Sequence, residues 1–85
     1  MYCLGIMDSG NYAFNICSIL RGKGYMAEVV STPCQITFSG CGYCLKFPDG
    51  LKDIVVNESR LAGLPVRAVY RVFPEAVKGK YQRIF

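Results

Sequence analysis

Short segments of the chain alternate apolar and polar residues, which is the pattern of β-strands that bury one face. The first strand is predicted over residues 1–7, where Tyr2, Leu4 and Ile6 share one face. The other predicted strands cover residues 25–31, 43–47 and 66–73. Glycine or proline residues stand near the ends of these segments, as expected where regular structure is interrupted.

Two other segments place their apolar residues at helical spacing. After the capping residues at 8–10, a helix is predicted to run to about Lys23, and Gly24 ends it. Its apolar positions are Ala13, Ile16, Cys17 and Leu20. A second helix is predicted from Pro48 to Gly63. Its apolar positions are Leu51, Ile54, Val55, Leu61 and Ala62.

The predicted order of elements is β-α-β-β-α-β within residues 1–73. This order is typical of an α+β, ferredoxin-like fold, in which two helices cover one face of a four-stranded antiparallel sheet and the other face is open. A chain of 85 residues supplies one hydrophobic core. We therefore predict a single domain over residues 1–73 and a C-terminal tail over residues 74–85.

Composition narrows the class of protein. Hydrophobic residues make up 52% of the chain and charged residues 19%, and no segment approaches the roughly 20 apolar residues that span a bilayer. The first residues lack the basic region and cleavage site of a secretory signal, so we expect a soluble cytoplasmic protein. The net charge of +4 includes Lys78, Lys80 and Arg83, which we interpret as a solvated tail rather than a nucleic-acid site.

The absence of histidine excludes hydrolysis by Cys–His or Ser–His–Asp groups. The glycine motifs of nucleotide-binding loops are absent, and the six carboxylates show no spacing that suggests a paired acid and base. We therefore expect a carrier or a binding protein rather than a conventional enzyme, and no cofactor.

Five cysteines are an odd number, which favours reduced thiols over a fully paired disulfide framework. Cys41 is the first candidate for a reactive thiol, because it lies between two glycines in Ser39-Gly40-Cys41-Gly42. Backbone amides can approach a sulfur closely in such a turn and stabilise its thiolate. On the residues alone, a structural role for Cys41 in a tight turn is an equal alternative.

Cys41 and Cys44 also form a C-x-x-C pair, the spacing of redox dithiols. Residues three apart in a strand point to opposite faces, so this pair would form only if residues 41–43 left the strand. By this alternation, Cys44 and Lys46 lie on the open face of the sheet. Cys34 follows a Thr-Pro dipeptide in a connection and is the second candidate for a resolving thiol.

A metal site is not expected. Cys34, Cys41 and Cys44 supply three thiols, whereas structural zinc sites use four ligands. Cys3 would have to supply the fourth ligand from the same face of the sheet as Cys44. Cys17 belongs to the apolar face of the first predicted helix and is interpreted as a buried, inert thiol.

The chain resembles the Se/S carrier protein-like family of small bacterial and archaeal domains. The resemblance rests on the opening strand, a Ser-led helix that ends in a glycine, Thr32-Pro33 after the second strand, and the Ser39-x-Cys41-Gly42 turn before an apolar strand. It runs from residue 2 to about residue 72. It implies that Cys41 holds sulfur or selenium as a persulfide or selenosulfide and passes it from a donor protein to an acceptor protein.

Under this interpretation, Ser39, Gly40, Gly42 and Lys46 are candidates to stabilise the Cys41 thiolate. Two other functions stay open. The first is a non-enzymatic binding or assembly module, which would use the open sheet face or an edge strand to bind another protein or a second copy of the chain. The second is a dithiol redox protein that uses Cys41 with Cys44 or Cys34.

Overall fold

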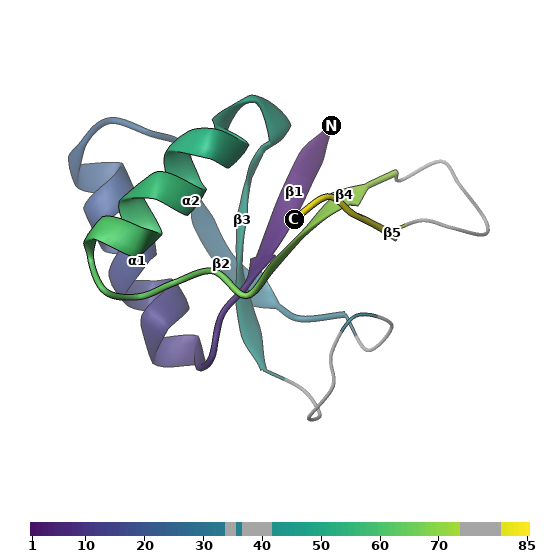
Figure 1. Cartoon of the computed structure of the whole chain (residues 1–85), viewed down its shortest axis with the longest axis horizontal. Coiled ribbons are helices and arrows are strands. Elements are labelled where there is room, and N and C mark those ends of the chain that lie inside the picture. The colour runs from purple at the N-terminus through teal and green to yellow at the C-terminus, as the bar shows by residue number, and fades with distance from the viewer. Residues whose placement is uncertain (34–35, 37–41, 74–80) are drawn as a thin grey trace.

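The computed structural model describes residues 1–33, 36, 42–73 and 81–85. Its strands are β1 (Tyr2–Ile6), β2 (Glu28–Ser31), β3 (Tyr43–Pro48), β4 (Ala68–Val72) and β5 (Tyr81–Arg83), and its α-helices are α1 (Gly10–Gly22) and α2 (Lys52–Leu61). The strands form one antiparallel sheet in the order β2-β3-β1-β4-β5. Both helices lie on the same side of the sheet (Figure 1). The predicted α+β class is therefore confirmed.

The helices begin and end close to the predicted residues. Ser9 caps α1, and its side-chain oxygen accepts a hydrogen bond from the Tyr12 amide at 3.4 Å. Gly24 follows α1 with a φ of +87°, a conformation that side chains with a Cβ rarely adopt. The second predicted helix is divided, because a 3₁₀ turn at Asp49–Leu51 precedes α2. Among the described residues, no helix is long and apolar enough to cross a membrane.

Strand β2 is shorter than the predicted segment of residues 25–31. The reason lies at the end of α1, where the Tyr25 amide donates a 2.9 Å hydrogen bond to the Leu20 carbonyl. This bond keeps Tyr25 at the helix terminus, so pairing with β3 starts only at Glu28, opposite Lys46. The remaining pairs bring Ser31 opposite Tyr43 at the other end of the two strands.

The predicted number of four strands is wrong, because the sheet has a fifth strand inside the predicted tail, and the ferredoxin-like topology is not confirmed. Tyr81 pairs with Val72 and Arg83 pairs with Tyr70, which places β5 on the outer edge of β4. The Ile84 amide continues this pairing with a 2.8 Å hydrogen bond to the Val69 carbonyl. Three residues are too few for an alternating pattern to be recognised in the sequence. They form a strand because their backbone groups hydrogen-bond to those of β4.

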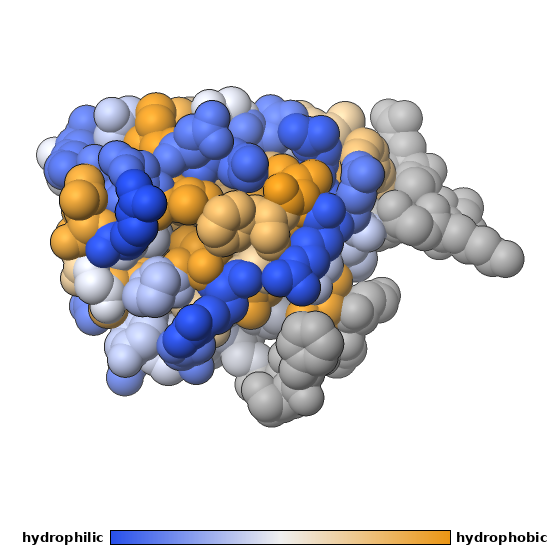
Figure 2. Space-filling view, in the orientation of Figure 1, coloured by the Kyte–Doolittle hydropathy of each residue, from blue (hydrophilic) through white to orange (hydrophobic). Residues whose placement is uncertain are grey.

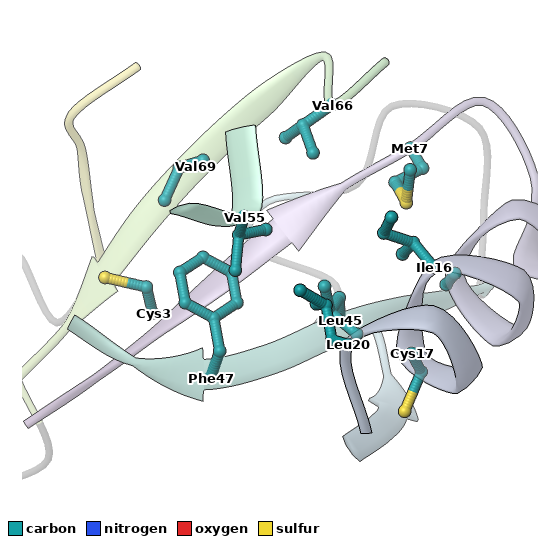
Figure 3. Close-up of a cluster of buried hydrophobic side chains, with 11 residues drawn as sticks. Cys3, Met7, Ile16, Cys17, Leu20, Leu45, Phe47, Val55, Val66 and Val69 are labelled. Atoms are coloured by element: carbon teal, nitrogen blue, oxygen red, sulfur yellow. The ribbon is translucent and has the colours of Figure 1, made fainter. Parts of the chain in front are cut away.

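The larger core lies between the helices and one face of the sheet. Figure 3 shows Phe47 and Val55 facing one another, with Ile16 and Leu20 of α1 near Leu45. Members of this cluster that are at most 7% exposed are Cys3, Met7, Ala13, Ile16, Cys17, Leu20, Leu45, Phe47, Val55, Val66 and Val69. The apolar positions predicted for the first helix are thus confirmed as its buried face.

A second, smaller cluster lies on the face of the sheet away from the helices. Leu4, Ile36, Cys44 and Val72 are at most 6% exposed there. Partly buried side chains pack around them, namely Tyr2, Ile6, Val30, Tyr70 and Tyr81. The expectation of an open face is therefore wrong at its centre. The cause is the apolar alternation of β1 and β4, which gives both strands large side chains on this face.

Large apolar side chains that remain exposed are distributed over the surface. They are Met1, Phe14, Ile19, Met26, Tyr43, Leu61 and Phe85. On the face shown in Figure 2, hydrophobic residues are interspersed with hydrophilic ones.

Replacement of Phe47 by alanine is expected to lower the free energy of unfolding by about 3–5 kcal/mol, because the ring is only 1% exposed at the centre of the larger core. Phe14→Ala is the matched control, since that ring is 53% exposed and its loss should cost less than about 1 kcal/mol. Urea denaturation measures both values. Equal destabilisation by the two substitutions would contradict this description of the core.

Candidate functional site

The predicted thiol turn and the second candidate thiol lie outside the described residues, since Ser39, Gly40, Cys41 and Cys34 are among residues 34–35 and 37–41. The residue next to the turn is described. Gly42 is exposed, and its carbonyl oxygen accepts a 2.7 Å hydrogen bond from the Thr32 amide. This bond extends the β2–β3 ladder by one step beyond the Ser31–Tyr43 pair. The backbone that leads into β3 is therefore held at Gly42.

Tyr43, the first residue of β3, lies against the N-terminal turn of α1. A Cβ added at Gly10 would come within 3.3 Å of Tyr43 Cδ2, so Gly10 leaves space that the tyrosine ring occupies. The ring centre of Tyr43 is also 5.7 Å from that of Phe14, and both side chains are about half exposed. The start of β3 is thus close to the N-terminus of α1, where unpaired backbone amides and the helix dipole create partial positive charge.

A bidentate ion pair joins the connection after β1 to the segment before β4. Arg67 donates from Nε and from a terminal nitrogen to the two carboxylate oxygens of Asp8, at 2.7 and 2.8 Å. The Arg67 amide also donates a 2.7 Å hydrogen bond to the Ile6 carbonyl. The hydrogen bonds from Arg67 lower the pKa of the Asp8 carboxyl, and the carboxylate in turn raises the pKa of Arg67. This ion pair was not predicted from the sequence, because its members are 59 residues apart.

Cys44 lies on the sheet face away from the helices, as its alternation with Leu45 and Phe47 predicts. It is not exposed there, because its side chain is 0% accessible in the smaller cluster. Burial raises the pKa of the Cys44 thiol, and a hydrogen bond from Thr32 acts in the opposite direction. A thiol in this position is hard to deprotonate and closed to a large reagent. This placement gives no support to Cys44 as a resolving thiol.

Cys3 and Cys17 belong to the larger core, on the helix side of the sheet. Burial raises the pKa of the Cys3 thiol, although the nearby Arg71 guanidinium opposes this effect. Cys3 and Cys44 therefore lie on opposite faces and do not share a site. Cys3, Cys17 and Cys44 are free thiols. Within the described ranges, no three cysteine, aspartate or glutamate side chains come together in a way that could hold a metal ion.

Lys46 was predicted to stabilise the Cys41 thiolate, and its observed contacts lie elsewhere. Its ammonium is 3.4 Å from Glu28 Oε1 and 4.4 Å from the centre of the Tyr2 ring. Lys46 lies in β3, four positions after Gly42, which corresponds to about 13 Å of extended chain. This placement gives no support to the role predicted for Lys46. The contact between Gly10, at the start of α1, and Tyr43, at the start of β3, was not predicted from the sequence.

The Asp8–Arg67 ion pair predicts a dependence of stability on pH. Because the pKa of Asp8 is lowered in the folded chain, the pair stabilises the fold above the ordinary pKa of the carboxyl, and this contribution is lost as the pH falls through the lowered value. Asp8→Asn should therefore destabilise the chain slightly near neutral pH and not in acid. Urea denaturation at both pH values measures the difference.

Asp53→Asn is the control for this substitution, since the Asp53 side chain is 99% exposed and lies 3.8 Å from Lys52. It should change the stability less than Asp8→Asn near neutral pH. A destabilisation by Asp8→Asn that stays the same in acid would show that the ion pair is not its source.

Alkylation of the native chain should distinguish the cysteines. Cys3, Cys17 and Cys44 are at most 7% exposed, so iodoacetamide reaches them only when the structure opens locally. Their modification should be slower than in the urea-unfolded chain by a factor on the order of a hundred. Peptide mass spectrometry at successive times measures the rate at each cysteine. Rapid modification of Cys44 in the native chain would contradict its burial.

The chain is similar to a known protein family. Residues 2–71 match the family described as putative Se/S carrier protein-like. No curated protein and no solved structure matches the chain. The matched range covers most of the chain, from the first residue of β1 to the penultimate residue of β4. The chain therefore belongs to the Se/S carrier protein-like family.

Proposed function

We propose that this chain carries sulfur or selenium on the thiol of Cys41, as a persulfide or a selenosulfide, between a donor protein and an acceptor protein. Membership of the Se/S carrier protein-like family is the observation that carries the proposal. It fits a chain that has thiols but no histidine. Reduced thiols require a reducing compartment, so the proposed location is the cytoplasm.

The burial of other cysteines supports the assignment to Cys41. A carrier thiol must reach a sulfur atom on a second protein, and Cys3, Cys17 and Cys44 are enclosed in the two hydrophobic clusters. Of the five cysteines, Cys34 and Cys41 remain as candidates. Only Cys41 has a glycine on each side, so its neighbours leave the backbone amides free of side chains.

The surroundings of Gly42 support the same assignment. Cys41 precedes Gly42 directly in the chain, and the residue after Gly42 packs against Gly10 at the start of α1. Partial positive charge at a helix N-terminus favours a thiolate over a thiol. We therefore expect backbone groups to stabilise the Cys41 thiolate.

The proposed transfer needs no oxidant or reductant. The Cys41 thiolate attacks the outer sulfur of a donor persulfide, R–S–SH, and a new S–S bond forms as the donor's S–S bond breaks. The products are the Cys41 persulfide and the donor thiolate, R–S⁻. An acceptor thiolate then attacks the outer sulfur of the Cys41 persulfide in the same way, which restores Cys41. Selenium would follow the same route as the outer atom.

Incubation with glutathione persulfide should add the mass of one sulfur atom to the chain, on the peptide that contains Cys41. Cys41→Ser should abolish this addition. Cys44→Ser is the matched control in the same C-x-x-C pair and should load as the unchanged chain does. Mass spectrometry of the intact chain and of its peptides measures both, and circular dichroism checks that the variants fold.

Two results would contradict the proposal or favour the dithiol alternative. Equal loading of the Cys41→Ser variant would show that another cysteine is the carrier. Formation of a disulfide between Cys41 and Cys34, with loading lost in Cys34→Ser, would favour dithiol redox chemistry instead.

A further inference from the structure

A cleft of about 700 Å³ lies at the end of the sheet where β2 begins. Its walls come from the start of β1, the end of β3, the end of α1 and the segment between α1 and β2. Its volume is within the range of pockets that hold small molecules. Lys46 lines this cleft, about 13 Å along β3 from Gly42. The cleft therefore lies at the end of β3 that is farther from Gly42.

The cleft exists because the β2–β3 ladder stops early. Gly24 turns the chain away from α1, and the Tyr25 amide stays bound to the Leu20 carbonyl. The first paired residues of the two strands are consequently Glu28 and Lys46. Residues 25–27 and residues 47–48 continue beyond this pair as opposite walls, and the space between them is the cleft. The cleft is therefore set by the backbone conformation at Gly24 and not by the rotamer of one side chain.

The apolar part of the cleft is aromatic. Tyr2 and Tyr25, which are partly buried, line it together with Phe47, whose side chain belongs to the larger core. Two methionines, Met1 and Met26, line it as well and are more than half exposed. Aromatic rings and thioether side chains are suited to contact with a flat, polarizable group.

The charged part of the cleft has an excess of cations. Arg21 and Lys46 line it with one carboxylate, that of Glu28. The Lys46 ammonium is held in position by Glu28 at 3.4 Å and by the Tyr2 ring at 4.4 Å. Glu28 is 60% exposed, so solvent weakens its attraction for Lys46 and leaves the ammonium able to bind a second anion.

The geometry points to a ligand site in this cleft for a small molecule that has a planar apolar body and one anionic group. The apolar body lies against Tyr25 and Tyr2. The anionic group accepts hydrogen bonds from Lys46 and is attracted by Arg21. A neutral ligand would form no ion pair with Lys46. A cationic ligand would be repelled by both Lys46 and Arg21.

The test uses 8-anilinonaphthalene-1-sulfonate, an aromatic sulfonate whose fluorescence rises in an apolar site. Titration of the folded chain should show saturable binding. Lys46→Gln and Arg21→Gln should each weaken the binding by about two- to fivefold, which is the effect of one partly exposed charge pair. Glu28→Gln should strengthen it, because removal of the carboxylate leaves Lys46 free for the ligand.

Lys52→Gln is the matched control for Lys46→Gln. The two lysines have similar exposure, with 31% for Lys52 and 35% for Lys46. Lys52 also has one carboxylate partner, Asp53, at 3.8 Å, and one aromatic partner, Phe85, at 5.9 Å. It does not line the cleft. Lys52→Gln should therefore leave the affinity unchanged.

Chemical-shift mapping by NMR locates the bound probe. The largest shifts should occur at residues 24–28 and 46–47, which line the cleft. Absence of saturable binding would overturn the proposal, as would equal loss of affinity in the Lys46→Gln and Lys52→Gln variants. Shifts confined to other residues would overturn it too. Because the probe does not involve a thiol, the result is independent of whether Cys41 carries sulfur.

Discussion

The burial of β1 on both faces is the constraint on which the rest of the structure depends. This strand pairs with β3 on one side and with β4 on the other. Cys3 of this strand, and Met7 directly after it, belong to the larger core under the helices, and Leu4 belongs to the smaller cluster on the opposite face. A shift of register by one residue would exchange these two sets, so the two clusters together fix how the three central strands align.

The burial of both sheet faces also determines where the described cysteines lie. Cys3 and Cys44 are small apolar side chains at central positions of the sheet, one on each face, and Cys17 fills a similar role in α1. The three cysteines that lie within strands or helices therefore serve as small apolar side chains in the hydrophobic clusters. The proposed carrier thiol, Cys41, lies in the sequence between β2 and β3, outside both of these elements.

Much of the fold could be predicted from alternation and helical spacing alone. The first four strands and both helices were found, because each has enough residues for its period to be visible. Strand β5 could not be found in this way, since its three residues become a strand only through the backbone groups of β4. The smaller cluster was missed for a related reason. The pattern of Val66 to Phe73 shows that one face is mostly apolar, and only the assembled sheet shows that Tyr70 and Val72 point away from the helices.

In the candidate site, too, some features could be predicted from the local sequence and others depend on how distant segments pack together. The alternation that places Cys44 away from the helices could be inferred from residue order, whereas the Cys41 turn stays a prediction. The nearness of Gly10 to Tyr43, the ion pair of Asp8 with Arg67 and the contact of Lys46 with Tyr2 all join segments that are distant in the chain. Such contacts follow from strand order, which a local pattern does not determine. The role predicted for Lys46 stays a prediction, since its described contacts are with Glu28 and Tyr2.

The position of β5 has a consequence for synthesis of the chain. Residues 2–72 supply β1 to β4, and until residues 81–83 leave the ribosome the outer edge of β4 has no strand beside it. An unpaired edge of this kind can add a strand from another molecule. Residues 81–83 therefore cover the outer edge of β4, and a chain that stops before Tyr81 leaves this edge free to pair with another molecule.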